Sequence, residues 1–211
     1  MNLKSLICYV VLGILLMGSG IVVSCDSFNE DLPECRLLVK FKYDYNMEFA
    51  DAFHAQVDKV ELYIFDKDGK FMFKQAEEGS ALSTGNYLME VELPVGQYQF
   101  MAWAGARDSY DITLLTPGVS TITDLKLKLK REASLIINKK METLWYGEII
   151  GVNFTGTEHQ TETINLIRDT KIVRFGFQSY TGTWTLDMND YDYEIIESNG
   201  HLGHDNSLQD D

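Results

Sequence analysis

Hydrophobic and polar residues alternate along most of the chain after residue 35. Segment 35–43 places Leu37, Val39, Phe41 and Tyr43 on one face and basic residues on the other, which is typical of a half-buried strand. The same period of two recurs in residues 59–65, 71–75, 87–93, 97–104, 120–131, 133–138, 144–154, 161–167, 171–180, 183–188 and 191–198. This pattern predicts an all-β protein.

One segment follows a different period. Between Asp44 and Asp58, the residues Phe49, Phe53 and Val57 recur at every fourth position, which is the spacing of one helix face. We expect about two helical turns here, packed on the core and connecting two strands.

A tight turn is predicted at residues 66–70, where a glycine follows two aspartates and joins two strands as a hairpin. Asp66, Asp68 and Glu77 also match the first, third and twelfth positions of a calcium-binding loop. That loop needs glycine at its sixth position, where Phe71 stands. We therefore predict a turn without a metal ion.

The strand pattern pauses and restarts near Lys130, which suggests a domain boundary there. We predict two β-sandwich domains in series, residues 35–130 with about seven strands and residues 131–211 with about five. The last residues are polar and add no closing strand, so the second sandwich would keep an open edge. Either the chain is a shortened form of a longer protein, or a partner completes it.

The N-terminus has a separate character. The run from Ser5 to Cys25 carries no charge and follows Lys4. An apolar run of ~20 residues can span a bilayer, so a transmembrane helix is one interpretation. Helix-breaking residues around Gly18 and the order of basic, apolar and small residues favour a secretory signal over residues 1–24.

Residues 22–25, Val-Val-Ser-Cys, resemble the bacterial lipobox, whose cysteine becomes the first residue after cleavage. In lipoproteins this cysteine carries acyl chains. Each buried methylene contributes roughly 0.8 kcal/mol and one chain binds only marginally, so several chains are needed for lasting attachment. We therefore predict that Cys25 is lipidated and that residues 25–34 form an acidic tether.

Asp26, Glu30 and Asp31 follow shortly after Cys25. In lipoproteins of the Bacteroidetes, acidic residues at this place resemble an address for export to the outer face of the outer membrane. The resemblance implies a surface-exposed protein anchored in the cell outer membrane. A periplasmic lipoprotein with a solvated tether is the alternative.

Composition limits the partners and the core. The 211 residues carry a formal charge of −14, which becomes −15 when Lys4 leaves with the signal. Such acidity disfavours nucleic acid and anionic membrane surfaces as partners. The three cysteines form no even framework, so we expect the fold to rest on an apolar core rich in its 11 Tyr, 11 Phe and 3 Trp residues. Cys35 is expected to be a buried strand residue.

No catalytic motif stands out, since Gly-x-Ser-x-Gly, a Cys-His pair and a phosphate-binding glycine loop are missing from the sequence. Paired carboxylates for glycoside hydrolysis depend on a spatial separation that a sequence does not show. The candidate metal ligands are His201, His204 and Asp205, and separately Asp187, Asp190 and Asp192. The first group lies on a glycine-bearing loop without a further strong ligand, and the second is typical of a turn. We predict no enzymatic activity, no metal site and no cofactor.

Several long segments carry a family resemblance. Residues 93–105 resemble the Pro-x-Gly-x-Tyr hairpin of transthyretin-like sandwiches. Together with residues 40–71, 115–131 and 144–170, they make the chain similar to the FimB-type fimbrial anchor subunits of the Bacteroidetes fimbrillin superfamily. The likeness runs from the lipobox to the C-terminus.

The resemblance implies a lipoprotein of two transthyretin-like domains that holds the base of a fimbrium on the outer membrane and influences fibre length. Its partner would be a fimbrial structural subunit, bound by strand complementation as in type V fimbriae, where an added strand pairs with an open sheet edge. Members of the family are usually longer, so we expect this chain to end inside the second domain.

A surface glycan-binding lipoprotein is the alternative, because such proteins also combine a lipidated cysteine, an acidic tether and serial β-sandwiches. Sugar faces stack on exposed aromatic rings, so Trp103, Trp145 and Trp184 are the residues to compare. We expect Trp103 in the core, because its strand is strongly apolar. Two exposed tryptophans on one platform would favour glycan binding, whereas buried tryptophans beside an unpaired sheet edge would favour the fimbrial function.

Overall fold

The structure is a computed structural model. It describes residues 35–131, 136–137, 139–178, 180, 182 and 187–210. The chain divides into two units, residues 1–34 and 35–211, and the fold below is that of the second unit. The signal peptide and tether predicted in the first unit lie outside the described residues. Within the described ranges, no helix is long and apolar enough to cross a membrane.

Strands make up most of the regular secondary structure in the described part of the chain, and helical turns are few and short, so the all-β prediction is confirmed. The strands are β1 (Leu37–Lys42), β2 (Lys59–Asp66), β3 (Phe71–Glu78), β4 (Met89–Val91), β5 (Gly96–Ala104), β6 (Tyr110–Ile112), β7 (Leu127–Leu129), β8 (Trp145–Phe154), β9 (Gln160–Arg168) and β10 (His201–Leu202). The helical turns are α2 (Phe53–Gln56), η1 (Leu82–Thr84), η2 (Ile122–Asp124) and η3 (Met188–Asp190).

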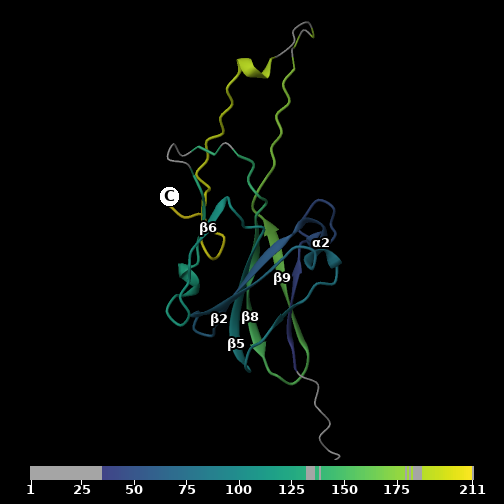
Figure 1. The fold of residues 1–211 in the computed structure, drawn as a ribbon, viewed down its shortest axis with the longest axis vertical. Coiled ribbons are helices and arrows are strands. Elements are labelled where there is room, and N and C mark those ends of the chain that lie inside the picture. Colours follow the sequence, from purple (N-terminus) through teal and green to yellow (C-terminus); the bar gives the residue numbers. More distant parts are fainter. Residues whose placement is uncertain are drawn as a thin grey trace, which may run out of the picture. The chain divides into compact units, whose positions relative to one another are not determined.

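The strands form two sheets (Figure 1). The larger has the order β3-β2-β5-β8-β9-β1-β4, and the smaller has the order β10-β7-β6. Paired strands are antiparallel except β1 and β9, which run parallel from the Leu37–Gln160 pair to the Lys42–Asn165 pair. β8 pairs with β9 only near Tyr146. Beyond this point the larger sheet separates into two layers, β3-β2-β5-β8 and β9-β1-β4, which share one core.

The first core lies between these two layers. It contains Leu37, Val39 and Phe41 of β1 together with alternate residues of β2, β5, β8 and β9, because successive side chains of a strand point to opposite faces. The rings of Phe41 and Phe53 stack with centroids 5.7 Å apart, which fixes α2 against the core. Burial of apolar surface at roughly 25 cal/mol per Å² makes this core a main source of stability.

A second core lies on the other face of β2 and β5. Tyr63 and Phe65 of β2, Met101 and Trp103 of β5, and Leu127 of β7 pack together there. The small sheet β10-β7-β6 covers this core, so β2 and β5 are buried on both faces. The strand expected over residues 120–131 is shorter than predicted, because η2 lies within this range and β7 covers only Leu127–Leu129. Leu125 and Leu127 are buried, whereas Lys128 and Lys130 are exposed.

The helix expected before Asp58 is shorter than predicted, because α2 is a single turn. Phe53 and Val57 are buried as expected, but Phe49 is 91% exposed. The carboxylate of Asp51 accepts a hydrogen bond from the backbone N–H of Phe53 at 3.1 Å. This local turn holds the chain outside a helix until Phe53, which explains why the fourfold spacing overestimates the helix.

The boundary expected near Lys130 does not divide the sheets. β8 and β9 follow it in the sequence, but β8 pairs with β5 and β9 pairs with β1. β10 likewise returns to pair with β7. The period of a strand shows which face is buried but not which distant strand will pair with it, and this is why the pattern misplaces the boundary.

The hairpin expected at residues 93–105 is instead a connection between the two layers. β4 pairs with β1, whereas β5 pairs with β2 and β8, so the turn at Pro94 carries the chain from one layer to the other. The hydroxyl of Tyr98 donates a hydrogen bond to the carbonyl of Pro94 at 2.6 Å and holds this turn against β5.

The tight turn at residues 66–70 is confirmed. It joins β2 and β3 as antiparallel neighbours, and Gly69 has a φ of +74°. The Oδ1 atom of Asp66 accepts hydrogen bonds from the N–H groups of Asp68 and Lys70, both at 2.9 Å. The Asp66 carboxylate therefore stabilises the turn through hydrogen bonds to its backbone.

Gly147 lies where three strands meet, in register with Ala102 of β5 and Leu166 of β9. A Cβ atom at this position would lie 2.8 Å from the Cβ of Ala102 and 2.8 Å from Cγ2 of Ile164. We expect Gly147→Ala to lower the free energy of unfolding by about 1–3 kcal/mol, because the neighbouring strands must move apart. Urea unfolding followed by tryptophan fluorescence measures the change.

Gly151→Ala is the matched control for this substitution. Gly151 lies in the same strand, and no heavy atom lies within 4 Å of its constructed Cβ. We expect its free energy of unfolding to change by no more than about 0.5 kcal/mol. Equal losses in the two variants would contradict the close packing at Gly147.

Candidate interaction surface

The predicted lipidation site, Cys25, lies outside the described residues and stays a prediction. Cys35 is described, and the prediction of its burial is wrong. It is exposed and precedes β1, which begins at Leu37. The alternating pattern therefore placed the start of this strand too early.

The histidine and aspartate clusters are held by local hydrogen bonds. His201 is buried, and its Nδ1 lies 2.9 Å from the carbonyl oxygen of Asp210. Asp205 Oδ1 accepts a hydrogen bond from the Ser207 hydroxyl at 2.6 Å, and Asp187 similarly serves the turn that contains η3. Among the residues that the structure describes, no three or more His, Cys, Asp or Glu side chains are grouped to hold a metal ion.

The two tryptophans in the described ranges are core residues. Trp103 is 0% exposed and its ring centroid lies 5.4 Å from that of Tyr146. Trp145 is 3% exposed and meets Tyr43 edge to face at 6.0 Å. Neither offers a face to a sugar, and the prediction for Trp103 is confirmed. Trp184 lies outside the described residues.

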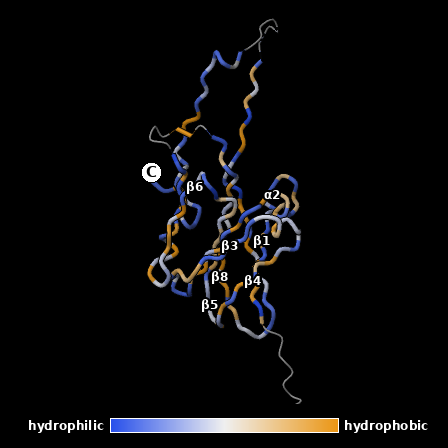
Figure 2. Tube along the Cα trace, in the orientation of Figure 1, coloured by the Kyte–Doolittle hydropathy of each residue, from blue (hydrophilic) through white to orange (hydrophobic). Residues whose placement is uncertain are grey.

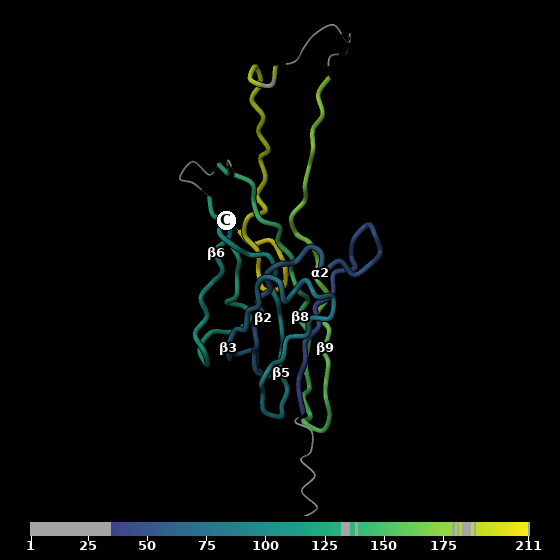
Figure 3. The backbone as a smooth tube through the Cα atoms, turned by 45° about the vertical axis from the view of Figure 1, so that its right-hand side comes forward, coloured from purple at the N-terminus to yellow at the C-terminus, as the bar shows by residue number. Residues whose placement is uncertain are grey.

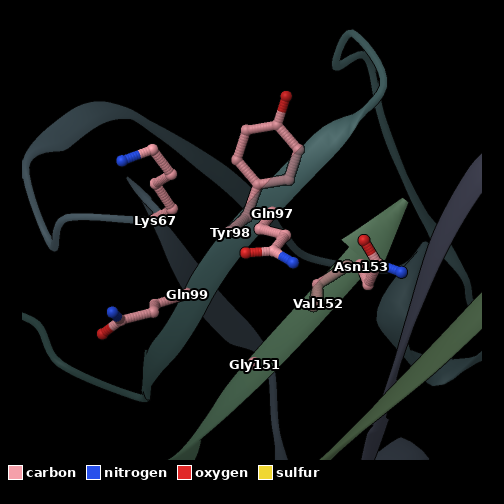
Figure 4. A pocket seen from close by; sticks show the side chains of 7 residues that line it. All are labelled: Lys67, Gln97, Tyr98, Gln99, Gly151, Val152 and Asn153. Carbon is pink, nitrogen blue, oxygen red and sulfur yellow. The ribbon is translucent and has the colours of Figure 1, made fainter. Parts of the chain in front are cut away.

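An open hollow of about 260 Å³ lies beside β5 and β8 (Figure 4). The amides of Gln97, Gln99 and Asn153 line it, and their donors and acceptors could serve a polar ligand. Tyr98 also borders the hollow, but its side chain is buried, and its hydroxyl donates a hydrogen bond to the Pro94 carbonyl. The hollow therefore lacks the exposed aromatic face on which a sugar ring would stack.

The edge strands of the larger sheet, β3 and β4, are partly covered. The N–H of Phe71 donates to the carbonyl of Ser120, and the N–H of Gly118 donates to the carbonyl of Phe71, both at 2.8 Å. Further along β3, Gln75 Nε2 donates to the backbone carbonyl of Glu90 in β4 at 2.9 Å, so the two edges meet. The end of β3 is rich in charged residues, which disfavour the addition of another strand.

Residues 171–178 and 191–200 form two extended segments that leave β9 and return to β10 (Figures 1 and 3); we call them the arm segments. Strands were expected at residues 171–180 and 191–198, but the structure assigns no strand to the arm segments. They approach each other where the ring centroids of Phe177 and Tyr193 lie 5.1 Å apart.

Hydrophobic residues occur along both arm segments (Figure 2). Ile172 is 77% exposed, Phe175 is 63% exposed and Ile196 is 84% exposed. Single exposed apolar residues are common, but their concentration on one part of a protein marks an interaction surface. Extended backbone combined with apolar side chains is also what an added β-strand requires. The arm segments are therefore the candidate interaction surface.

Asp169 joins the end of β9 to the last turn of the described chain. Its Oδ1 accepts a hydrogen bond from Asn206 Nδ2 at 2.8 Å, and its backbone N–H donates to the carbonyl of Leu144 at 3.0 Å. Burial raises the pKa of Asp169 from 3.8 to about 6, although the hydrogen bond from Asn206 acts in the opposite direction. The sequence does not indicate this environment, because Asn206 lies far along the chain from Asp169.

Comparison with known proteins identifies relatives of the chain. The family of fimbrillin-A associated anchor proteins Mfa1 and Mfa2 matches residues 32–211. The minor fimbrium anchoring subunit Mfa2 of Porphyromonas gingivalis is 25% identical over 199 residues, which cover 90% of this chain and 59% of that protein. The chain thus spans about three fifths of the length of this relative.

Two solved structures resemble the chain. A crystal structure from Bacteroides thetaiotaomicron, provisionally described as a polysaccharide-binding protein, is 92% identical, has a TM-score of 0.81, and is matched over 84% of this chain and 63% of its own. The fimbrial anchor protein Mfa2 from Porphyromonas gingivalis has a TM-score of 0.59 at 22% identity, over 84% of this chain and 64% of its own. At this identity the second structure supports the fold alone.

Replacement of Asp169 by asparagine is expected to stabilise the chain at neutral pH. The folded carboxyl has a pKa of about 6 against 3.8 when unfolded, so the folded state holds the extra proton between these values and loses stability as the pH rises through 6. Asparagine keeps an acceptor for Asn206 without the buried charge. We expect Asp169→Asn to raise the free energy of unfolding at pH 7 by up to about 3 kcal/mol.

Urea unfolding of both proteins at pH 4 and pH 7 tests this expectation. Other carboxyl groups change stability equally in the two proteins, so the difference between them isolates Asp169. The difference should be largest at pH 7 and mostly disappear at pH 4. An equal difference at both pH values would contradict the burial of this carboxyl.

Proposed function

The chain belongs to the family of fimbrillin-A associated anchor proteins Mfa1 and Mfa2, and we propose that it holds the base of a fimbrium at the bacterial cell surface. The family match confirms the resemblance to fimbrial anchor subunits, and the family is one of anchor proteins, not of enzymes. Because the chain spans about three fifths of its relatives, the function of the whole protein and its partners belong to this proposal.

The arm segments are the observation that carries the proposal. In strand complementation, an extended segment of one subunit adds main-chain hydrogen bonds to another, and its alternate side chains fill pockets. The arm segments offer extended backbone and exposed apolar groups such as Phe175 and Ile196, whereas β3 and β4 are partly covered. We therefore assign the arm segments as the place where a strand of the fimbrial structural subunit binds.

Attachment to the membrane is assigned to Cys25. The lipobox supports acylation of this cysteine, and the acidic residues after it support display on the outer face of the outer membrane. The tether of residues 25–34 precedes β1, an internal strand of the larger sheet. A lipid on Cys25 would thus hold the sheet itself. By occupying the base of the fibre, the anchor would also influence fibre length.

Glycan binding is the second candidate function. The hollow lined by Gln97, Gln99 and Asn153 favours it, as does the provisional description of the 92% identical structure. The burial of Trp103 and Trp145 favours the fimbrial function instead, because these rings offer no stacking platform.

Removal of the lipid attachment site is expected to release fibres. In the bacterium that makes this chain, Cys25→Ala should move fimbriae from washed cells into the medium, because a protein without acyl chains has no lasting hold on the membrane. Immunoblotting of a fimbrial structural subunit in the two fractions measures the shift. We expect most of the fibre protein in the medium.

Ser27→Ala, two residues after the cysteine, is the matched control and should leave the fibres on the cells. The altered proteins must first be shown to be made and exported. Fibres that stay on cells carrying Cys25→Ala would overturn the anchor function for this chain and favour glycan binding.

Charged substitutions on the arm segments are expected to weaken subunit binding. Phe175→Asp combined with Ile196→Asp places two carboxylates on the proposed docking surface, where an added strand would have to desolvate them. We expect at least a tenfold loss of affinity for the fimbrial subunit, which corresponds to about 1.4 kcal/mol. Co-purification and titration with the isolated subunit measure it.

Leu114→Asp is the control for this experiment. Leu114 is more exposed than Phe175 and Ile196, and it lies after β6, outside the arm segments. Its substitution should leave subunit binding unchanged. If the control weakened binding as much as the arm variant, the effect would not belong to the arm segments.

A further inference from the structure

The first strand of the larger sheet and the last one lie side by side in it. β1 follows the tether, β9 leads into the arm segments, and the two pair along six register positions. We propose that the β1–β9 ladder is a mechanical clamp, which carries the tension between the membrane tether and the fimbrium. This inference rests on the proposed function for the two points at which force is applied.

The parallel direction of the two strands decides how they bear the load. The tether would pull β1 by its N-terminal end at Leu37, and the fibre would pull β9 by its C-terminal end at Arg168. In a parallel pair these ends lie at opposite ends of the ladder, so the strands are pulled past each other. The hydrogen bonds of a parallel ladder are evenly spaced and therefore share the load.

The reverse arrangement would be weaker. If β1 and β9 were antiparallel, the same two ends would lie together, and tension would open the hydrogen bonds one after another. The antiparallel pairs of the larger sheet are formed with β2, β3, β4, β5 and β8. Only two of these strands adjoin the clamp: β4 pairs with β1, and β8 pairs with β9. Strands β2 to β8 lie between β1 and β9 in the sequence, so they bear the tension only after the clamp has broken.

Side-chain packing adds resistance to sliding. Leu37, Val39 and Phe41 of β1 and Ile164 of β9 are at most 2% exposed and belong to the same core. Displacement of β1 along β9 would move all of these side chains out of close-packed positions at once. The N–H of Gln160 also donates to a backbone carbonyl before Leu37, at 2.9 Å, so the ladder extends to the start of β1.

The other attachments of the loaded segments are shorter. β1 pairs with β4 over three register positions. The second arm segment leads into β10, which pairs with β7 over two register positions. The residues after β10 are attached to the end of β9 by the hydrogen bond that Asn206 donates to Asp169. The six-position ladder is thus the longest pairing that joins the tether side to the arm side.

Single-molecule pulling in two directions tests the clamp on the same fold. The full chain with Cys8→Ser and Cys25→Ser receives one handle at Lys171→Cys, after β9. The second handle is placed either at the exposed native Cys35, before β1, or at Tyr45→Cys with Cys35→Ser, after β1. The first geometry pulls opposite ends of the parallel strands, and the second pulls their neighbouring ends.

We expect the first geometry to unfold at a force at least about twofold higher at the same loading rate, because the evenly spaced bonds break together. Equal forces, or a higher force in the second geometry, would overturn the proposal. Neither outcome depends on a substitution within the ladder, so impaired folding of a variant does not limit the comparison.

A proline in the ladder gives an independent measurement. Because the bonds to β1 recur at every second residue of β9 and Gln160 donates one of them, the N–H of Glu162 also faces β1. Glu162→Pro removes this donor. We expect it to lower the unfolding force in the first geometry, whereas Asp111→Pro in β6, outside the clamp, should not. Equal effects of the two prolines would contradict the clamp.

The pulling experiment uses the isolated protein, so its result is separate from that of the anchor assay. Equal forces with fibres released by Cys25→Ala would leave an anchor without this clamp. A force difference combined with fibres that stay on the cells after Cys25→Ala would show that the ladder resists force but that the protein does not anchor the fibre. The proposal that the ladder carries tension between tether and fimbrium would then fail.

Discussion

Burial of β2 and β5 on both faces is the constraint on which the rest of the structure depends. In β2, Val60, Leu62 and Ile64 face the first core while Tyr63 and Phe65 face the second. A strand that is apolar on both faces needs a covering layer on each side. One cover is formed by β1, β4 and β9, and the other by β6, β7 and β10. The chain must therefore bring together segments that are far apart in the sequence.

This requirement explains which parts of the fold the sequence predicts. The turn at residues 66–70 depends on neighbouring residues, and it was predicted correctly. The boundary near Lys130 depends on which distant strands pair, and the period of a strand carries no such information. Phe49 had the right spacing for a helix, but the hydrogen bond that the backbone N–H of Phe53 donates to the nearby Asp51 carboxylate competes with that helix.

The predictions for the candidate site also differ according to whether they depend on neighbouring residues or on distant contacts. The prediction that Cys25 is lipidated rests on a short local motif and stays a prediction, whereas the burial of Trp103 followed from the apolar character of its own strand and is confirmed. The arm segments were predicted as strands because their residues alternate, yet a strand also needs a ladder of backbone hydrogen bonds, and the structure assigns no strand to residues 171–178 and 191–200. The environment of Asp169 is set by Asn206, and no feature near Asp169 in the sequence announces it.

The parallel pairing of β1 with β9 also determines when the protein can finish folding. β1 is the first strand to be made, but its longest partner ends only at Arg168. Contacts between distant parts of a chain form slowly, because a long loop must close first. In a polypeptide that crosses a membrane before it folds, this delay is useful. Because the sheet cannot be completed until β9 has been made, such a delay fits the export that we propose for this chain.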